Sequence, residues 1–301
     1  MTLIQRYDAL LFDLDGTVWH GDVPIPGAAE ALRGCDPIYL TNNASKAPAE
    51  VQDKLAGMGF PRGGVLTSAQ AAVALAAETK PGASALILGA DSFRRLAGEA
   101  GLRVVESADE RPDFVLHGHS PETGWRQLSE AALAIRAGAR YIASNRDTSL
   151  PSERGLMVGN GSMVAAVESA TGVRAVAAGK PETRMFEQAA RGAERPLVIG
   201  DRLDTDIAGG VAAGMDTLHV LTGVSTAWDL LTAPPEHRPT YVAEDLGGLH
   251  MEPEDLRPGP REGTRAYRDG DAIVVEGPAH QGLLAALPLA WEAPFSEVRG
   301  L

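Results

Sequence analysis

Short aliphatic runs alternate along most of the chain with longer stretches whose apolar residues recur at helical spacing. The runs that predict buried strands are Leu10–Phe12, Ile38–Leu40, Ala85–Leu88, Phe114–Leu116, Tyr141–Ala143, Leu197–Ile199 and Thr217–Val220. Helices are predicted from near Ser45, from about Trp125 to Ala137, after Pro181 and after Asp204. Alternating strands and helices are typical of a parallel α/β sheet, which binds ligands at the carboxyl ends of its strands.

The pattern changes beyond about Met251, where prolines become frequent. Asp269-Gly270 then lies between strand-like residues, which predicts a β-hairpin. A short helical stretch interrupted by Pro288 follows. We therefore expect residues 255–301 to form a small appendage, a hairpin plus a short helix, outside the main sheet.

Two aspartates end the first predicted strand. Asp13 and Asp15 follow Leu10–Phe12, and alternate residues of a strand point to the same side, so both carboxylates can face one pocket. Two close carboxylates repel each other unless a cation lies between them. Gly16 permits a backbone turn here, and an ordinary Asp-Gly turn is the alternative explanation.

A second acidic segment, Gly200–Asp206, follows the predicted strand Leu197–Ile199. Asp201 precedes the next helix, where a metal ligand would lie, whereas Asp204 is expected to be the helix N-cap. Two acidic strand ends together predict an oxygen-ligand site for Mg²⁺, which needs few protein carboxylates.

Two further segments carry groups that suit a phosphate. Thr41, Asn42 and Asn43 end a predicted strand with hydroxyl and amide donors, and a polar loop with an Asx turn is the alternative. Lys180 lies just before a helix whose first turn contains Pro181, and a solvated lysine is the alternative. His117 and His119 follow another strand without a recognisable third metal ligand, so we expect a structural role for them.

Composition narrows the class of protein. The chain has 301 residues, 44% of them hydrophobic and 22% charged, as in ordinary globular proteins. Its net charge of -13 argues against nucleic acid or an anionic membrane as a partner. The single cysteine, Cys35, forms no internal disulfide, and neither a signal peptide nor a transmembrane run is recognisable. A cytoplasmic location is expected, and assembly into a homo-oligomer stays open.

The four polar segments, in this order, resemble the motifs of the haloacid dehalogenase superfamily. They are Asp13-Leu14-Asp15-Gly16-Thr17, Thr41-Asn42-Asn43, Gly179-Lys180-Pro181 and Gly200-Asp201-Arg202-Leu203-Asp204-Thr205-Asp206. Ala143–Asp147, followed by Gly159-Asn160-Gly161, is similar to the NagD-type (class IIA) branch of phosphatases. The resemblance covers roughly residues 5–250, most of the chain.

The resemblance implies a role for each matching residue. Asp13 would be the nucleophile, and Asp15 would protonate the leaving oxygen and then activate water. Thr41 and Lys180 would hold the phosphoryl group, and Asn42 and Asn43 would also bind the phosphate or the substrate. Mg²⁺ would bind Asp13, the backbone carbonyl of Asp15, and Asp201. Asp206 would not bind Mg²⁺ itself but would orient the groups that do.

The resemblance also implies the domain organisation. The expected fold is α/β, with a Rossmann-like parallel-sheet core and an inserted α/β cap domain of the C2 type. Too few residues separate Asp13 from Asn42 to form a cap there, so the cap is expected over residues 80–177. The core would comprise residues 1–79 and 178–254. Asn145, Asp147 and Asn160 of the cap would contact the substrate's leaving group, and turn formation is the alternative.

These features predict a Mg²⁺-dependent phosphatase that hydrolyses a small phosphate monoester through an aspartyl-phosphate. Among substrates the appendage favours glycerol phosphate, because it resembles a tail found in relatives of that kind, and phosphoglycolate and pyridoxal phosphate stay open. One alternative is a catalytically silent protein that binds a phosphorylated metabolite. Another is a phosphotransferase that passes the phosphoryl group to a sugar.

Overall fold

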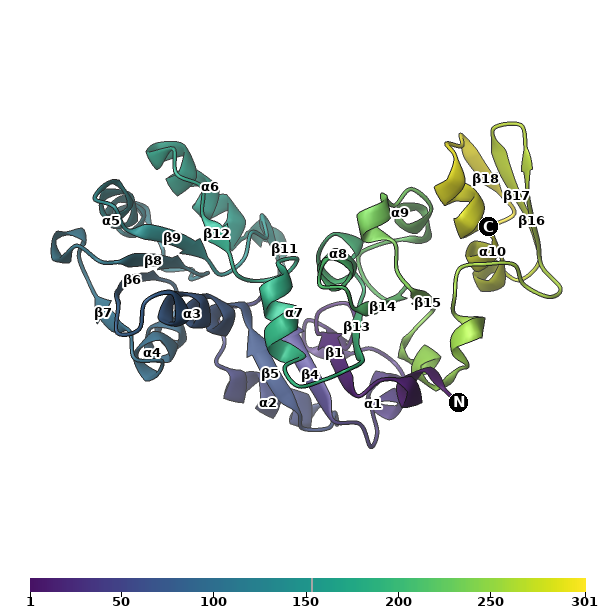
Figure 1. Cartoon of the computed structure of the whole chain (residues 1–301), viewed down its shortest axis with the longest axis horizontal. Coiled ribbons are helices and arrows are strands. Elements are labelled where there is room, and N and C mark those ends of the chain that lie inside the picture. Colours follow the sequence, from purple (N-terminus) through teal and green to yellow (C-terminus); the bar gives the residue numbers. More distant parts are fainter. Residues whose placement is uncertain (153) are drawn as a thin grey trace. The chain divides into compact units, whose positions relative to one another are not determined.

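The computed structural model describes residues 1–152 and 154–301 of the chain (Figure 1). The described chain divides into two compact units. Unit 1 comprises Met1–Tyr39, Ala56–Gly64 and Ala190–Leu301, and unit 2 comprises Leu40–Leu55 and Val65–Ala189. Within the described residues, no helix has both the length and the apolar character needed to cross a membrane.

The main sheet has six strands in the order β15-β14-β13-β1-β4-β5. Their bounds are β1 (Ala9–Asp13), β4 (Pro37–Thr41), β5 (Gly64–Thr67), β13 (Pro196–Gly200), β14 (Asp216–Val220) and β15 (Tyr241–Ala243). β1 pairs parallel with β13, which pairs parallel with β14. The middle of β1 and of β13 is fully buried, as a strand covered on both faces requires. The predicted parallel α/β fold is confirmed.

Short helices and a small hairpin complete the rest of unit 1 before the appendage. They are η1 (Leu3–Arg6), β2 (Trp19–His20), β3 (Val23–Pro24), α1 (Ala28–Ala31), η3 (Leu203–Ile207), α8 (Ala208–Ala212), α9 (Ala227–Leu231), η4 (Pro235–His237), η5 (Leu246–His250) and η6 (Pro253–Asp255). η3 is a π-helical turn that leads directly into α8. π-Helical turns are rare and occur mostly at functional sites, and this one follows the acidic residue Asp201.

Unit 2 contains a second parallel sheet, ordered β12-β9-β8-β6-β7. Its strands are β6 (Ser84–Leu88), β7 (Arg103–Val105), β8 (Phe114–His117), β9 (Arg140–Ala143) and β12 (Val176–Ala177). α5 (Trp125–Arg136) and α6 (Asn160–Thr171) cover one face, and α3 (Ser68–Thr79) and α4 (Asp91–Glu99) cover the other (Figure 1). The remaining elements are α2 (Pro48–Gly57), η2 (Ala108–Glu110), α7 (Thr183–Ala189) and the antiparallel hairpin of β10 (Ser149–Ser152) and β11 (Gly155–Val158).

A buried histidine makes the stability of unit 2 depend on pH. His117, at the end of β8, is fully buried, and its Nδ1 lies 2.8 Å from the hydroxyl of Tyr141. Burial lowers the pKa of His117 from 6.5 to about 4. The folded state therefore keeps this histidine neutral at a pH where the unfolded chain already binds a proton.

We expect the free energy of unfolding to fall as pH drops from 6.5 toward 4. The pKa is lower in the folded state, so the stabilisation is complete above pH 6.5 and is lost on acidification. The loss attributable to His117 reaches about 3 kcal/mol near pH 4. Urea unfolding of the wild type and of His117→Gln at several pH values measures it. An equally steep acid loss in the variant would assign the effect to other groups.

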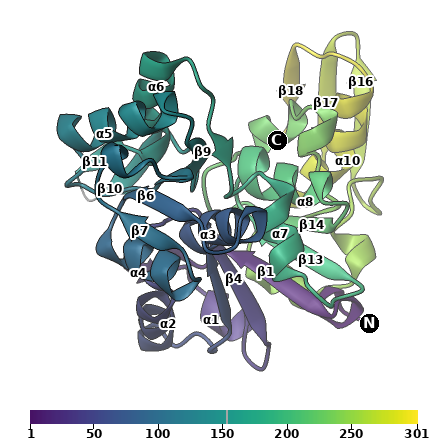
Figure 2. The same ribbon diagram turned by 60° about the vertical axis from the view of Figure 1, so that its left-hand side comes forward.

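The C-terminal appendage contains a third strand that the sequence does not predict. β16 (Arg265–Asp269) and β17 (Ala272–Glu276) form the expected antiparallel hairpin, and β18 (Glu297–Arg299) adds a third strand parallel to β17. α10 (Ala279–Glu292) packs against this sheet (Figure 2). The helix is not interrupted at Pro288, although proline cannot donate to the carbonyl four residues earlier. That carbonyl, of Leu284, instead accepts a bond of 2.9 Å from Gly259 N–H, which explains how the helix continues.

One hydrophobic cluster joins the appendage to the rest of unit 1. It contains Leu284 and Leu287 of α10 together with Leu203 and Ile207 of η3. The indole Nε1 of Trp291 also donates to the carbonyl of Leu230 in α9 at 2.8 Å. The appendage therefore shares a core with the segment that follows Asp201.

We expect Leu284→Ala to destabilise unit 1 by about 2–5 kcal/mol, because its side chain is fully buried in this shared cluster. Leu301→Ala is the matched control, since that leucine is 46% exposed. Denaturant unfolding measures both. Equal small changes in the two variants would show that the appendage contributes little to the stability of the core.

Candidate active site

Three carboxylates converge at the carboxyl end of the main sheet. Asp13 ends β1, and Asp201 follows β13, the strand beside it in parallel register. Asp206 comes from η3. One oxygen of each carboxylate lies within 4.8 Å of the others. The sheet topology thus brings together residues that are almost two hundred positions apart in the sequence.

Asp201 is held by several groups around it. It is fully buried, and its Oδ2 accepts a bond of 2.6 Å from Val224 N–H. The hydroxyl of Thr17 lies 3.4 Å from Oδ1. A Cβ at Gly16 or at Gly223 would collide with this carboxylate, and Gly16 also has a φ of 97°. Both positions therefore require glycine, and Gly16 requires it for two reasons.

Asp206 and Asp204 have different environments although they are two residues apart. Asp206 is buried, and its Oδ2 accepts from Arg202 N–H at 3.1 Å. Asp204 is exposed and forms two bonds with the Arg202 guanidinium, of 3.0 and 2.8 Å. The predicted N-cap role of Asp204 is wrong, because it lies inside η3 and its carboxylate is paired with that arginine.

This cluster fits a divalent cation. Asp201 and Asp206 are fully buried carboxylates, and bringing like charges this close together is costly without a positive partner. All three side chains offer the oxygen ligands that Mg²⁺ prefers. Asp206 lies close enough to be a ligand, although the sequence assigned it an orienting role.

The side chain of Asp15 is not one of the three converging carboxylates. It is exposed, and its Oδ1 accepts a hydrogen bond of 2.9 Å from Nε1 of Trp19. The resemblance implies that only the backbone carbonyl of Asp15 binds the metal, which leaves this side chain for acid-base chemistry. Trp19 was not predicted to belong to the site, although the sequence places it only four residues after Asp15.

In unit 2, Asn42 organises the loop that carries Lys180. Its Oδ1 accepts from the backbone N–H of Lys180 at 2.9 Å, and its Nδ2 donates to the carbonyl of the same residue at 3.1 Å. Nδ2 also lies 3.3 Å from Oδ1 of Asp147. Lys180 is only 5% exposed, so the solvated alternative does not describe it. The amide of Asn42 is thus used to fix the lysine loop.

Thr41 and Asn43 shape the preceding turn. Thr41 is buried, and its hydroxyl oxygen accepts from Asn43 N–H at 3.0 Å, a bond that leaves the hydroxyl able to donate its own proton. The Asn43 carboxamide oxygen accepts from Ser45 N–H at 2.9 Å. This is the Asx turn that the sequence analysis gave as the alternative for Asn43.

The other polar residues expected to contact substrate are tied to the backbone of unit 2. Asn145 donates to the carbonyl of Asn42 at 2.7 Å and accepts from Asp147 N–H at 3.2 Å. Asn160, the first residue of α6, donates to the carbonyls of Asn145 at 3.0 Å and of His117 at 3.2 Å. The bond to Asp147 N–H is a local turn, whereas the amide nitrogens of Asn145 and Asn160 join segments that are distant in the sequence.

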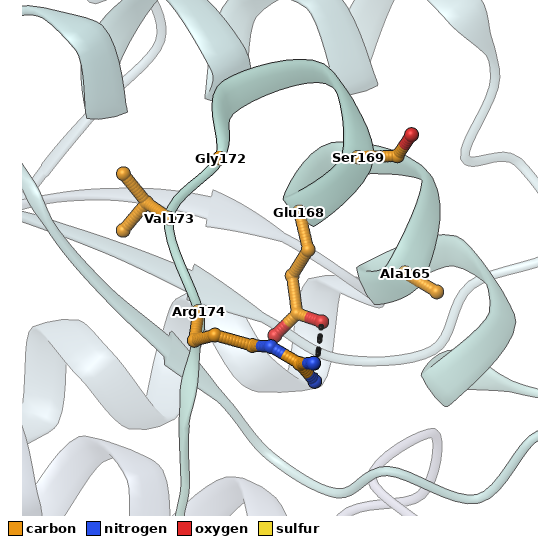
Figure 3. Close-up of a pocket in the computed structure, with 6 residues that line it drawn as sticks. All are labelled: Ala165, Glu168, Ser169, Gly172, Val173 and Arg174. Carbon is orange, nitrogen blue, oxygen red and sulfur yellow. Dashed lines mark ion pairs between the residues drawn. The ribbon is translucent and has the colours of Figure 1, made fainter.

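A separate open pocket lies beside the C-terminal end of α6 (Figure 3). Its lining residues are Ala165, Glu168, Ser169, Gly172, Val173 and Arg174. Glu168 is paired with Arg174 at 3.8 Å, and it also accepts from Arg146 at 2.8 Å. None of the predicted site residues lines this pocket, and its charged groups neutralise one another.

Comparison with known proteins agrees with these motifs. A family model described as haloacid dehalogenase-like hydrolase matches residues 10–103, and a second HAD-hydrolase-like model matches residues 177–249. A D-glycerol 3-phosphate phosphatase of Mycobacterium tuberculosis is 47% identical over 281 residues, which cover 91% of this chain and 80% of the relative. An acid sugar phosphatase of Staphylococcus aureus is 39% identical over 254 residues, which cover 81% of this chain and 96% of the relative.

Solved structures of similar proteins also include phosphatases. The crystal structure of a glycerol phosphate phosphatase from Mycobacterium tuberculosis in complex with magnesium superposes with a TM-score of 0.95 at 44% identity. It covers 100% of this chain and 95% of that one. Identity of this extent over nearly the whole chain is decisive: the protein belongs to the haloacid dehalogenase-like hydrolase family, in its NagD-like phosphatase branch.

Proposed function

We propose that this protein hydrolyses glycerol phosphate with Mg²⁺, through an aspartyl-phosphate on Asp13. The enzyme is a phosphoric monoester hydrolase that acts on a small phosphorylated metabolite. The observation that carries the proposal is the convergence of the Asp13, Asp201 and Asp206 carboxylates beside the strand end that bears Asp15. A family member with an intact nucleophile, acid and metal cluster is poorly explained as a catalytically silent binding protein.

The residues divide the chemistry as follows. A carboxylate oxygen of Asp13 bonds to phosphorus while the bond from phosphorus to the leaving oxygen breaks, and Asp15 gives its proton to that oxygen. Water then attacks the phosphorus and gives a proton to Asp15, which releases inorganic phosphate and regenerates Asp13. Asp13, Asp201 and Asp206, with the carbonyl of Asp15, would hold Mg²⁺, which would supply positive charge to neutralise the phosphoryl group.

Thr41 and Lys180 bind the phosphoryl oxygens in this proposal. Lys180 brings a positive charge on a loop that Asn42 fixes, and Thr41 brings a hydroxyl donor. Asn42 and Asn43 then act by shaping these two loops. In the same way Asn145 and Asn160 support the loop of Asp147, which is the remaining candidate for contact with the leaving group.

We keep the domain division expected from the sequence as part of this proposal. Residues 1–79 and 178–254 would form the catalytic core, residues 80–177 the cap and residues 255–301 the appendage. A cap of this size restricts the enzyme to small metabolites. The single cysteine supports a cytoplasmic location.

The choice of glycerol phosphate depends on the relatives. The M. tuberculosis glycerol phosphate phosphatase structure covers this chain completely, including the appendage. The acid sugar phosphatase is covered almost completely by only 81% of this chain. The glycerol phosphate enzyme therefore matches the appendage as well, whereas the match to the acid sugar phosphatase leaves part of this chain uncovered.

Phosphate release with glycerol 3-phosphate, phosphoglycolate and pyridoxal 5′-phosphate, each with Mg²⁺, tests the proposal. We expect the highest kcat/KM for glycerol 3-phosphate. A higher value for either of the others would reassign the substrate. Phosphate transferred to added sugars in preference to water would instead show a phosphotransferase.

A further inference from the structure

The indole of Trp19 holds one oxygen of the Asp15 carboxylate. Trp19 Nε1 donates to Asp15 Oδ1 at 2.9 Å. The tryptophan is only 4% exposed, whereas Asp15 is exposed. A donor fixed in the core therefore holds one oxygen of an exposed carboxyl group, which limits the rotamers that this side chain adopts.

The backbone around this contact is also fixed. Gly16 N–H donates to the carbonyl of Trp19 at 2.8 Å, and Trp19 N–H donates to the carbonyl of Leu14 at 3.1 Å. The hydroxyl of Thr222 donates to the carbonyl of Gly16 at 2.6 Å. The indole and the carboxyl group thus belong to one small, cross-linked loop, so their relative position is set by the fold.

We propose that Trp19 is a positioning residue for the acid Asp15, and that it selects the oxygen that carries the transferable proton. An indole N–H only donates, so the oxygen that it contacts must act as an acceptor. In a neutral carboxyl group the carbonyl oxygen is the better acceptor, so the bond from the indole favours the proton on the other oxygen, Oδ2. This inference rests on the proposed role of Asp15.

The leaving group provides the test. The alkoxide of glycerol is a poor leaving group and needs a proton as the bond to phosphorus breaks, whereas p-nitrophenolate leaves readily without one. The ratio kcat/KM reports the steps up to departure of the leaving group. We expect Trp19→Phe to lower kcat/KM for glycerol 3-phosphate by roughly 10- to 100-fold, since misplacing a catalytic group costs about that much. The value for p-nitrophenyl phosphate should change by less than about 3-fold, since little acid catalysis is needed there.

Trp291→Phe is the matched control. Its indole also donates one hydrogen bond within unit 1, at 2.8 Å, but to the backbone carbonyl of Leu230. Any loss of activity caused by removing a buried indole in general should affect both substrates equally, and this control measures that effect. If Trp19→Phe does not fold, benzothienylalanine at position 19 keeps the shape of tryptophan and removes only the N–H.

Asp15→Asn separates this inference from the proposed function. A loss selective for glycerol 3-phosphate in Asp15→Asn, together with equal losses on both substrates in the Trp19 variant, would overturn the role of Trp19 alone. Equal losses on both substrates in Asp15→Asn would remove the acid role itself, and this inference with it. Matching selectivity in the two variants is the expected result.

Discussion

Asp13→Asn should abolish turnover and leave the fold intact. An amide is a far weaker nucleophile than a carboxylate, and uncatalysed hydrolysis of phosphate monoesters is among the slowest reactions known. Loss of a covalent nucleophile in other enzymes lowers kcat by roughly 10⁶-fold, and we expect a loss of at least about 10⁴-fold here. Steady-state phosphate release and thermal unfolding of the variant measure activity and folding separately.

Asp204→Asn is the matched control for this change. It is the same substitution near the same strand ends, but the Asp204 carboxylate is exposed and paired with Arg202. We expect its activity to stay within a few-fold of wild type, as for a surface substitution. Acid quenching during turnover, followed by borohydride reduction and mass spectrometry, should locate the phosphorylated aspartate at position 13 in the wild type. Near-normal turnover of folded Asp13→Asn would exclude it as the nucleophile.

The strands of the central sheet could be predicted from the sequence because they are buried on both faces. Runs such as Leu10–Phe12 and Leu197–Ile199 are continuous and apolar, and they lie inside β1 and β13. The position of both acidic segments at carboxyl strand ends followed from those runs. The convergence of Asp13 with Asp201 then follows from parallel pairing of neighbouring strands.

The helix α3 was missed because half of its residues are alanine and its sequence shows little periodicity. It is buried on several sides, so no polar face marks it. A local signal was nevertheless present. Thr67 and Gln70 form a capping box, in which Gln70 N–H donates to the Thr67 hydroxyl at 3.2 Å and Thr67 N–H donates to the Gln70 side chain at 2.9 Å.

The contacts of individual side chains could not be predicted, because they depend on long-range folding. Asn42 resembles a phosphate ligand in sequence, yet its amide pairs with the backbone of Lys180, 138 residues away. The bond from Trp19 to Asp15 is local, but neither residue type nor spacing distinguishes it from an ordinary buried tryptophan. Residue identity predicted the chemistry of the site, and only the fold shows which groups support others.

Removal of divalent cations should abolish activity, and Mg²⁺ should restore it. Asp13, Asp201 and Asp206 place three carboxylates within 4.8 Å, an arrangement whose repulsion a bound cation offsets. For the same reason we expect Mg²⁺ to raise the unfolding temperature of the apoprotein. At a concentration about 100 times Kd, the expected stabilisation is about 2.7 kcal/mol.

Calcium should bind to this site and fail to support full turnover. It takes more oxygen ligands at longer distances than Mg²⁺, so the phosphoryl group would be held in a different position. We expect Ca²⁺ to compete with Mg²⁺, which raises the Mg²⁺ concentration needed for half-maximal rate. Calorimetric titration of the chelated protein with each ion measures binding independently of activity.

Asp201→Asn tests whether the Asp201 carboxylate binds the cation. The buried carboxylate of Asp201 is held by Val224 N–H, so an amide of the same size can occupy its place but supplies no negative charge. We expect Mg²⁺ affinity to fall by roughly 10- to 100-fold or more, since even supporting groups of a metal site have effects of that size. Asp204→Asn, outside the cluster, should leave the affinity unchanged. Full activity after exhaustive chelation, or unaltered Mg²⁺ binding by Asp201→Asn, would show that the three carboxylates do not form the metal site.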